Sequence, residues 1–211
     1  DADIDMHIDE TDSIDAKTLE MLAEQTIENN WIGRVTAGHT CALAGYTDAY
    51  ASNVISLVKQ ANINMITNPA TNLMLQGRLD VQPKRRGITR VKELLSAGVN
   101  VSFGQDCVDD TFYPFGRVDP LEVALITSHA AHMSLPSEIQ QIFDMQTYSA
   151  ARLMGSNDYG ISPGCLGDLV ILDASDPADA IRHHALRKTV IKRGKIILEN
   201  EAFSKWHWTQ R

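Results

Sequence analysis

Apolar and polar side chains recur along the chain with two alternating periods. Residues 4–8 alternate between the two kinds, as in a strand, and residues 17–29 place apolar side chains on one helical face. One strand and one helix about every 30 residues is the spacing of a parallel α/β fold. Further strands are predicted at 34–39, 64–70 and 99–106, and further helices at 47–61, at 89–97 and over most of 119–154.

The ends of these elements are marked by residue types that favour caps and turns. Thr47 or Asp48 is expected to cap the helix at 47–61, and Gly98 is expected to end the helix at 89–97. The third strand is predicted to end at Pro69, with a long polar loop after it.

After Gly164 the pattern changes to short strands, at 167–173 and 188–200. The second of these segments is predicted to fold back at Arg193-Gly194, with a helix or turn between the two segments. We therefore expect two domains: residues 1–160 with the strand and helix repeat, and residues 161–211 with a small β subdomain and the tail. Trp206 and Trp208 are interpreted as a packing anchor for that tail.

Composition narrows the classes of function. The net charge of −8, with basic residues clustered only at 84–86, argues against binding to a nucleic-acid backbone. Three cysteines without CxxC spacing argue against a disulfide framework or a cysteine-based zinc site. No apolar run approaches the length of a membrane span. We expect a protein of the reducing cytoplasm that binds neither nucleic acid nor membrane.

Each predicted strand of the first domain ends near a polar side chain of a kind that enzymes use. Taken alone, a histidine or aspartate at a strand end is an ordinary packing or capping residue. In an α/β barrel, however, the carboxyl ends of the strands face the active site, so several such residues together predict a site. In chain order they are His7, His39, Asn68 and Asp106.

These side chains suit metal-assisted hydrolysis. Neutral imidazole and carboxylate bind a divalent ion, which lowers the pKa of a bound water towards neutrality. In the first strand, His7 shares a predicted polar face with Asp3, Asp5 and Asp9, and that face is expected to point at the metal. Glu10, three residues after His7, is placed to act there as a general acid and base.

Five stretches of the sequence resemble the cytosine deaminases of the amidohydrolase superfamily. The resemblance implies a distorted (β/α)8 TIM barrel with a β-sandwich, one iron or zinc ion, and hydrolysis of cytosine to uracil and ammonia. The stretches are HIDE at 7–10, GHT at 38–40, NPATNLMLQGRLD at 68–80, PKRRGITRVKELL at 83–95 and FGQD at 103–106.

The resemblance also implies residue roles. His7 and Asp106 would be metal ligands, and Asp106 would also act as a base. Glu10 would move protons and contact the pyrimidine ring, and His39 would steer the attacking hydroxide. Two further residues, Cys107 and Phe112, would contact the substrate.

The chain departs from the family pattern in its ligand set. The family takes two further ligands from an HxH pair on the first barrel strand, and no HxH pair occurs in the 211 residues. We therefore expect the C-terminal half of the barrel, from about the fifth strand, with the other half supplied by the same or another chain. If the chain is complete as given, a non-catalytic binding or scaffold module is the alternative. A homo-oligomer is possible in either case.

A second departure lies at the substrate pocket. The family's FGHDD reads FGQDC here, with Gln105 and Cys107 in place of histidine and aspartate. A less acidic pocket leaves related rings open as substrates: 5-methylcytosine, isoguanine, or an aminotriazine such as ammelide. Cys107 as a nucleophile is the poorer interpretation, because hydrolysis at a metal needs none.

Other polar residues are weaker candidates for metal or substrate binding. His129 and His132 have a spacing that can bind metal, although apolar neighbours favour a packed position. Asn72 and Gln76, in the expected polar loop, are candidates for substrate contact. Arg85 and Arg86 are interpreted as part of a solvated loop, with anion binding as the alternative.

Overall fold

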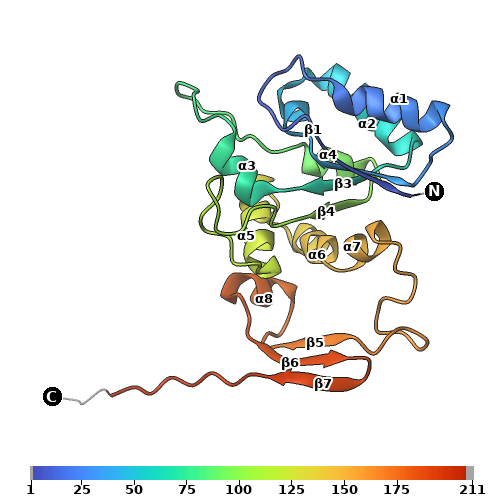
Figure 1. Ribbon diagram of the computed structural model, residues 1–211. Helices are drawn as coiled ribbons and strands as arrows, with labels where there is room; N and C mark the ends of the chain where they lie inside the picture. Colours follow the sequence, from blue (N-terminus) through green and yellow to red (C-terminus); the bar gives the residue numbers. More distant parts are fainter. Residues whose placement is uncertain (1, 208–211) are drawn as a thin grey trace. The chain divides into compact units, whose positions relative to one another are not determined.

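The computed structural model describes residues 2–207, which form two compact units divided between Asn157 and Asp158. The first unit contains a four-stranded parallel sheet with the strand order β1-β2-β3-β4 (Figure 1). The α/β class predicted from the sequence is confirmed. The strands are β1 (Ile4–Ile8), β2 (Val35–His39), β3 (Asn64–Thr67) and β4 (Val101–Phe103).

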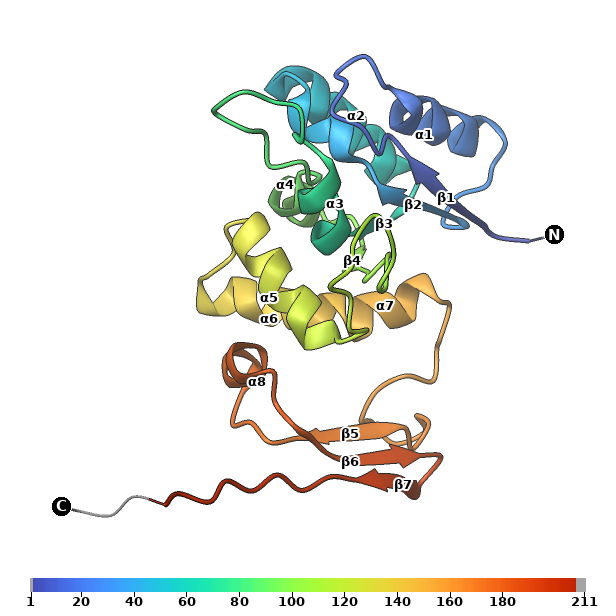
Figure 2. The ribbon, with the colours of Figure 1, turned by 60° about the vertical axis from the view of Figure 1, so that its left-hand side comes forward.

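Helices follow each strand of this sheet. Both ribbon views place α1 and α2 together beside β1 and β2, and α5, α6 and α7 together at the β4 end of the sheet (Figures 1 and 2). Their bounds are α1 (Thr18–Glu28), the short 3₁₀ helix η1 (Cys41–Gly45), α2 (Asp48–Gln60), α3 (Pro69–Leu75), α4 (Val91–Ser96), α5 (Pro120–Ala130), α6 (Pro136–Met145) and α7 (Tyr148–Leu153).

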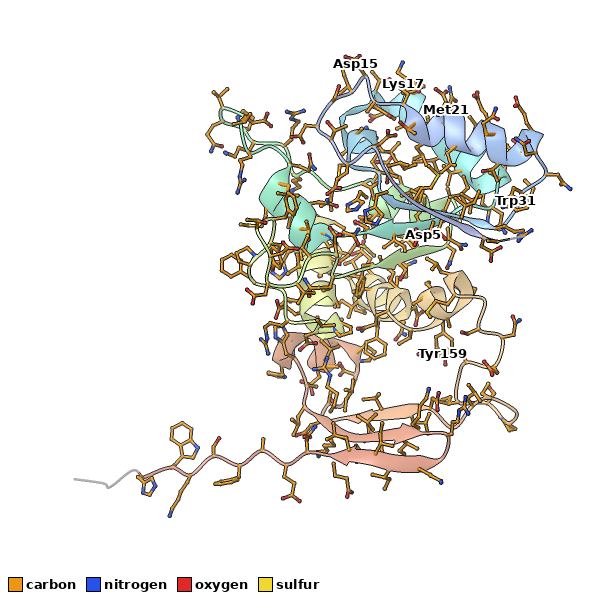
Figure 3. The ribbon with its side chains drawn as sticks, viewed as in Figure 1. Asp5, Asp15, Lys17, Met21, Trp31 and Tyr159 are labelled. Carbon is orange, nitrogen blue, oxygen red and sulfur yellow. The ribbon has the colours of Figure 1, made fainter. Side chains whose placement is uncertain are left out.

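The helix α1 shows how the predicted apolar face is used. Leu19 and Ala23 are completely buried, whereas Met21 is exposed and points away from the sheet (Figure 3). Thr26 lies on the buried face and satisfies its hydroxyl by donating to the carbonyl of Leu22 at 2.7 Å. The predicted cap of α2 is also confirmed, because the side chain of Thr47 accepts a hydrogen bond from the backbone of Tyr50.

The region after β3 differs from the prediction, because a helix occupies the start of the expected loop. Pro69 does not end the strand but opens α3, a position that suits a residue without a backbone N–H. The fourth strand is shorter than predicted and ends at Phe103. At Gly104 a side chain would lie 2.8 Å from the amide oxygen of Asn68, and Asp106 adopts a positive φ of 64°.

Asp9 corrects the expected polar face of the first strand. The strand ends at Ile8. Asp9 has a φ of 49°, so its side chain does not continue the alternation of the strand. Its carboxylate accepts hydrogen bonds from the backbone N–H of Thr18 at 3.0 Å and of Leu19 at 2.9 Å. The residue at the N-cap of α1, Lys17, makes no side-chain cap, so Asp9 takes that role.

The second unit is built on a three-stranded antiparallel sheet with the strand order β5-β6-β7. The predicted turn at Arg193-Gly194 is confirmed, since both residues have positive φ, as two-residue hairpin turns require. The predicted packing of Trp206 is wrong, because its side chain is 89% exposed, and Trp208 lies outside the described residues. The elements are β5 (Leu169–Leu172), α8 (Pro177–His183), β6 (Arg187–Lys192) and β7 (Lys195–Glu199).

Within the described residues, no helix has the length and apolar character that crossing a membrane requires.

The cap that Asp9 provides is testable by substitution. Asp9→Ala leaves two N–H groups at the start of α1 without their acceptor, so we expect the free energy of unfolding to fall by about 1–3 kcal/mol. Asp9→Asn keeps an acceptor oxygen and should lose less. Urea denaturation of the full-length protein measures both changes. The exposed Asp15→Ala serves as the control and should stay within about 0.5 kcal/mol; an equally stable Asp9→Ala protein would contradict this role.

Candidate active site

The parallel pairing of β1 and β2 brings two histidines into contact at the carboxyl end of the sheet. The register pairs His7 with Gly38 and Ile8 with His39. His7 Nδ1 lies 3.0 Å from His39 Nε2, with ring centroids 4.6 Å apart. His39 is 1% exposed, whereas His7 is open to solvent. The two imidazoles therefore form one wall of a site that remains accessible.

Asp106 completes a group of potential metal ligands. One donor atom from each of His7, His39 and Asp106 lies within 4.8 Å of the others, and this is the cluster of at least three such residues found among residues 2–207. Two imidazoles and a carboxylate are the ligand types that zinc prefers, and three protein ligands leave a position for water or substrate. The donor set fits a catalytic divalent ion.

Three residues at or next to this cluster have a positive backbone φ. His39 and Thr40 have φ of 69° and 50°, and Asp106 has φ of 64°. Positive φ is uncommon for residues other than glycine and is concentrated at functional sites. Thr40 is held after the turn by a hydrogen bond from its hydroxyl to that of Thr89 at 2.8 Å.

Glu10 lies beside His39, with Oε1 3.3 Å from His39 Nδ1. Its side chain is 32% exposed, so it contacts both the buried imidazole and the open part of the site. A carboxylate in this position can accept a proton from a bound group and return it to another.

The helix α3, which the sequence did not predict, lines the other side of His39 and Glu10. Asn68, Asn72 and Gln76 are spaced one turn apart, and all three side chains face these two residues. The contacts are Asn68 Nδ2 to His39 Nε2 at 3.3 Å, Asn72 Nδ2 to His39 Nδ1 and to Glu10 Oε1 at 3.1 Å each, and Gln76 Nε2 to the Glu10 carbonyl at 3.3 Å.

Two loops are tied together beside the site. Asp12, two residues after Glu10, accepts a hydrogen bond from the backbone N–H of Gly77 at 2.6 Å and is not a member of the ligand cluster. Arg85 donates to the Asp12 carbonyl at 2.5 Å and forms a bidentate pair with Asp80. The hydrogen bonds from Arg85 lower the pKa of Asp80 to about 2. Arg85 thus stabilises the exposed loop in which it lies.

The two residues expected to contact substrate lie in the loop after β4. Cys107 donates its backbone N–H to Thr71 Oγ1 at 3.4 Å, and its side chain is half-buried. Burial, and then its hydrogen bond with Asp110, raise the pKa of the Cys107 thiol, which makes it a poor nucleophile. Phe112 is 58% exposed on the same loop.

The alternative metal pair lies elsewhere. His129 Nδ1 is hydrogen-bonded to the Leu125 carbonyl within its own helix at 2.8 Å. His132 follows the end of that helix and has φ of 54°. Neither belongs to the ligand cluster found in the described part of the chain.

A model of the amidohydrolase family matches residues 1–198. The chain belongs to the amidohydrolase family. A pterin deaminase of Rhizobium rhizogenes is 34% identical over 197 residues, covering 92% of this chain and 45% of that protein. The N-isopropylammelide isopropyl amidohydrolase of Pseudomonas sp. strain ADP is 32% identical over 202 residues, covering 95% of this chain and 47% of that protein.

Solved amidohydrolase structures are similar as well. The 5-methylcytosine deaminase from Klebsiella pneumoniae, liganded with 5-fluorocytosine, superposes with a TM-score of 0.92 at 40% identity. That match covers 96% of this chain and 49% of the other. The resemblance to cytosine deaminase-like amidohydrolases is confirmed. The chain spans about half the length of the relatives it matches.

The ligand cluster predicts which substitutions abolish metal binding. After reconstitution of the full-length protein with Zn²⁺, we expect about one ion per chain, and we expect His7→Ala and Asp106→Ala to lose it because each removes a ligand. Plasma mass spectrometry of the desalted proteins measures the content. His129→Ala is the matched control and should keep the ion. Full occupancy in His7→Ala would show that the metal binds elsewhere.

Proposed function

We propose that the protein is a metal-dependent hydrolytic deaminase of cytosine or a closely related amino-substituted ring, releasing ammonia. The observation that carries the proposal is the convergence of His7, His39 and Asp106, with Glu10 3.3 Å from His39. Similarity to a 5-methylcytosine deaminase and to a pterin deaminase supports it.

We infer that residues 1–160 are the C-terminal half of a (β/α)8 barrel and that residues 161–211 belong to a β-sandwich. Four parallel strands in sequential order, with helices after them, support the first inference, and the antiparallel sheet of β5, β6 and β7 supports the second. The relatives are about twice as long as the matched region. We propose that the other half of the barrel, in the same or another chain, completes the site.

His7 and Asp106 would hold the divalent ion, zinc or iron. When bound, such an ion lowers the pKa of a coordinated water and so supplies a nucleophile near neutral pH. In this proposal His39 is a neighbour of the ion that forms a hydrogen bond to the attacking group, since it contacts His7 but is buried behind it.

In this proposal, side chains in and beside the ligand cluster transfer the protons. Glu10 takes one proton from the attacking water, gives it to the ring nitrogen next to the carbon under attack, and contacts the ring. Asp106, with His39, takes the remaining proton from the same oxygen and delivers it to the amino group, which leaves as ammonia. One water is consumed, and the amino group is replaced by an oxygen.

The choice of ring depends on the residue after Asp106. Cys107 stands where the cytosine deaminase pattern has an aspartate, which makes this part of the pocket less acidic. Substrates such as 5-methylcytosine, isoguanine or ammelide are therefore the alternatives, and Phe112 is proposed as a further contact with the ring. A protein that holds no ion and releases no ammonia would instead be a binding module.

Glu10→Gln separates proton transfer from metal binding. Because the amide cannot carry the proton, turnover should fall by about 10² to 10⁴-fold, while metal content stays at the wild-type level. Ammonia release and metal analysis measure the two quantities on the same preparation. Glu24→Gln, on the exposed face of α1, is the control and should leave both unchanged. Loss of the ion in Glu10→Gln would make Glu10 a ligand and refute this role.

Cys107→Asp tests the substrate contact. A carboxylate at this position should favour a polar ring edge over a methyl group, so the ratio of kcat/KM for cytosine to that for 5-methylcytosine should rise. Competition between the two substrates reports the ratio directly. Cys165→Asp, in the second unit, is the matched control. If the ratio is the same in Cys107→Asp and in the wild type, Cys107 has no part in specificity.

A further inference from the structure

Glu10 lies in a segment without regular structure, so its position depends on contacts with other parts of the chain. Residues 9–17, between β1 and α1, form no helix or strand. Asp9 fixes the beginning of this segment through its hydrogen bonds at the start of α1. Asp12 fixes the segment on the other side of Glu10. A general acid and base must lie within hydrogen-bond reach of the groups that it serves, so these contacts bear on catalysis.

Asp12 is bound to the loop after α3 through both its side chain and its backbone. Its Oδ2 accepts a hydrogen bond from Gly77 N–H at 2.6 Å, and its carbonyl accepts one from Arg85 Nη1 at 2.5 Å. Arg85 Nη2 also lies 3.9 Å from Asp12 Oδ2. Gln76 Nε2, at the start of the same loop, donates to the Glu10 carbonyl at 3.3 Å. The residues on which the position of Glu10 depends are therefore attached to one loop.

Arg85 reaches Asp12 in a fixed orientation. Asp80 accepts hydrogen bonds from Arg85 Nε at 2.8 Å and from Nη2 at 2.6 Å, which leaves Nη1 for the Asp12 carbonyl. Because a guanidinium is planar, two bonds to one carboxylate also set the direction of the third nitrogen. Gly77 packs closely against this arginine, since a side chain there would lie 2.9 Å from the Arg85 carbonyl oxygen. The loop thus presents two donors together, Gly77 N–H and Arg85 Nη1.

We propose that Asp12 and Arg85 are positioning residues that hold Glu10 in place for proton transfer. Neither belongs to the ligand cluster found among residues 2–207. They act through the backbone of the segment that carries Glu10, whose carboxylate lies 3.3 Å from His39 Nδ1. A misplacement of about 1 Å can lower a rate by a factor of about 10². The inference rests on the proposed function, because it concerns the step in which Glu10 moves a proton.

Substitution of Asp12 tests the inference in the metal-replete full-length protein. Asp12→Ala removes the acceptor of Gly77 N–H, so kcat for ammonia release should fall by about 10 to 100-fold, while metal content stays at the wild-type level. Asp12→Asn keeps an acceptor oxygen and should recover most of the lost kcat. Asp15→Ala, at an exposed position of the same segment, is the control and should keep the wild-type kcat. A wild-type kcat in Asp12→Ala would overturn the proposal.

Arg85→Lys tests the geometry of the guanidinium. Lysine keeps the positive charge but cannot reproduce two parallel bonds to Asp80 together with a third bond to Asp12. We therefore expect kcat to fall as it does in Asp12→Ala. Arg78→Lys, at an exposed position of the same loop, is the matched control and should be as active as the wild type. Equal activity of Arg85→Lys and the wild type would overturn the role assigned to Arg85.

A double substitution shows whether Asp12 acts through Glu10. In Glu10→Gln the carboxylate that carries the proton is already lost, so its placement no longer matters. Adding Asp12→Ala to this variant should lower kcat by less than about 3-fold. A second loss of about 10 to 100-fold would show that Asp12 supports the protein by another route, and it would overturn the proposal.

Hydrogen exchange measures the contact between Asp12 and Gly77 without reference to catalysis. Gly77 is buried, and in metal-free protein its N–H should exchange about 5 to 10-fold faster in Asp12→Ala than in the wild type. NMR of the backbone amides measures both rates, and equal rates would overturn the proposal. A metal-replete wild type that releases no ammonia would refute the proposed function itself. An active wild type, with faster exchange but unchanged kcat in Asp12→Ala, would refute this inference alone.

Discussion

The parallel register of β1 and β2 is the constraint on which the site depends. Hydrogen bonding between these strands sets His7 opposite Gly38 and Ile8 opposite His39, so that both imidazoles emerge at the same edge of the sheet. A slip of one residue would turn every side chain of a strand to its opposite face. The contact of 3.0 Å between the rings would then be lost, and with it the cluster that includes Asp106.

At this edge of the sheet, the polar side chains that follow the strand ends are positioned by hydrogen bonds to one another. The helix α3 and the two residues that flank it supply three amides to His39 and Glu10, and the pair of Asp80 and Arg85 fastens the loop that follows. Asp12 connects this loop to the segment that carries Glu10. Hydrogen bonds therefore hold the α3 side of the candidate site, whereas His7 is exposed to solvent.

Much of this architecture could be predicted from the sequence, because periodicity reports directly on burial. The first strand, the helices α1 and α2, and the hairpin at Arg193-Gly194 were all indicated by their patterns. The helix α3 was missed because Pro69 was interpreted as the end of a strand. An asparagine followed by proline is also a helix start, and the i, i+4, i+8 spacing of Asn68, Asn72 and Gln76 was the signal available.

Other features depend on the three-dimensional structure alone. Alternation placed Asp9 on the same face as His7, but the strand ends one residue earlier and the carboxylate caps α1 instead. The positive φ at His39 and at Asp106 likewise arises from the way each strand ends. Such local departures follow from tertiary contacts that are distant in sequence, as between Asp9 and Leu19 or between Glu10 and Asn72.

The central claim is that the strand ends of this sheet assemble a catalytic metal site. Anomalous diffraction from crystals of the holoprotein, collected on both sides of the absorption edge of the bound metal, tests this claim most directly. The account predicts one peak within about 2.0–2.2 Å of a ring nitrogen of His7 and of a carboxylate oxygen of Asp106. A metal-replete protein whose peak lies away from these two residues would contradict it.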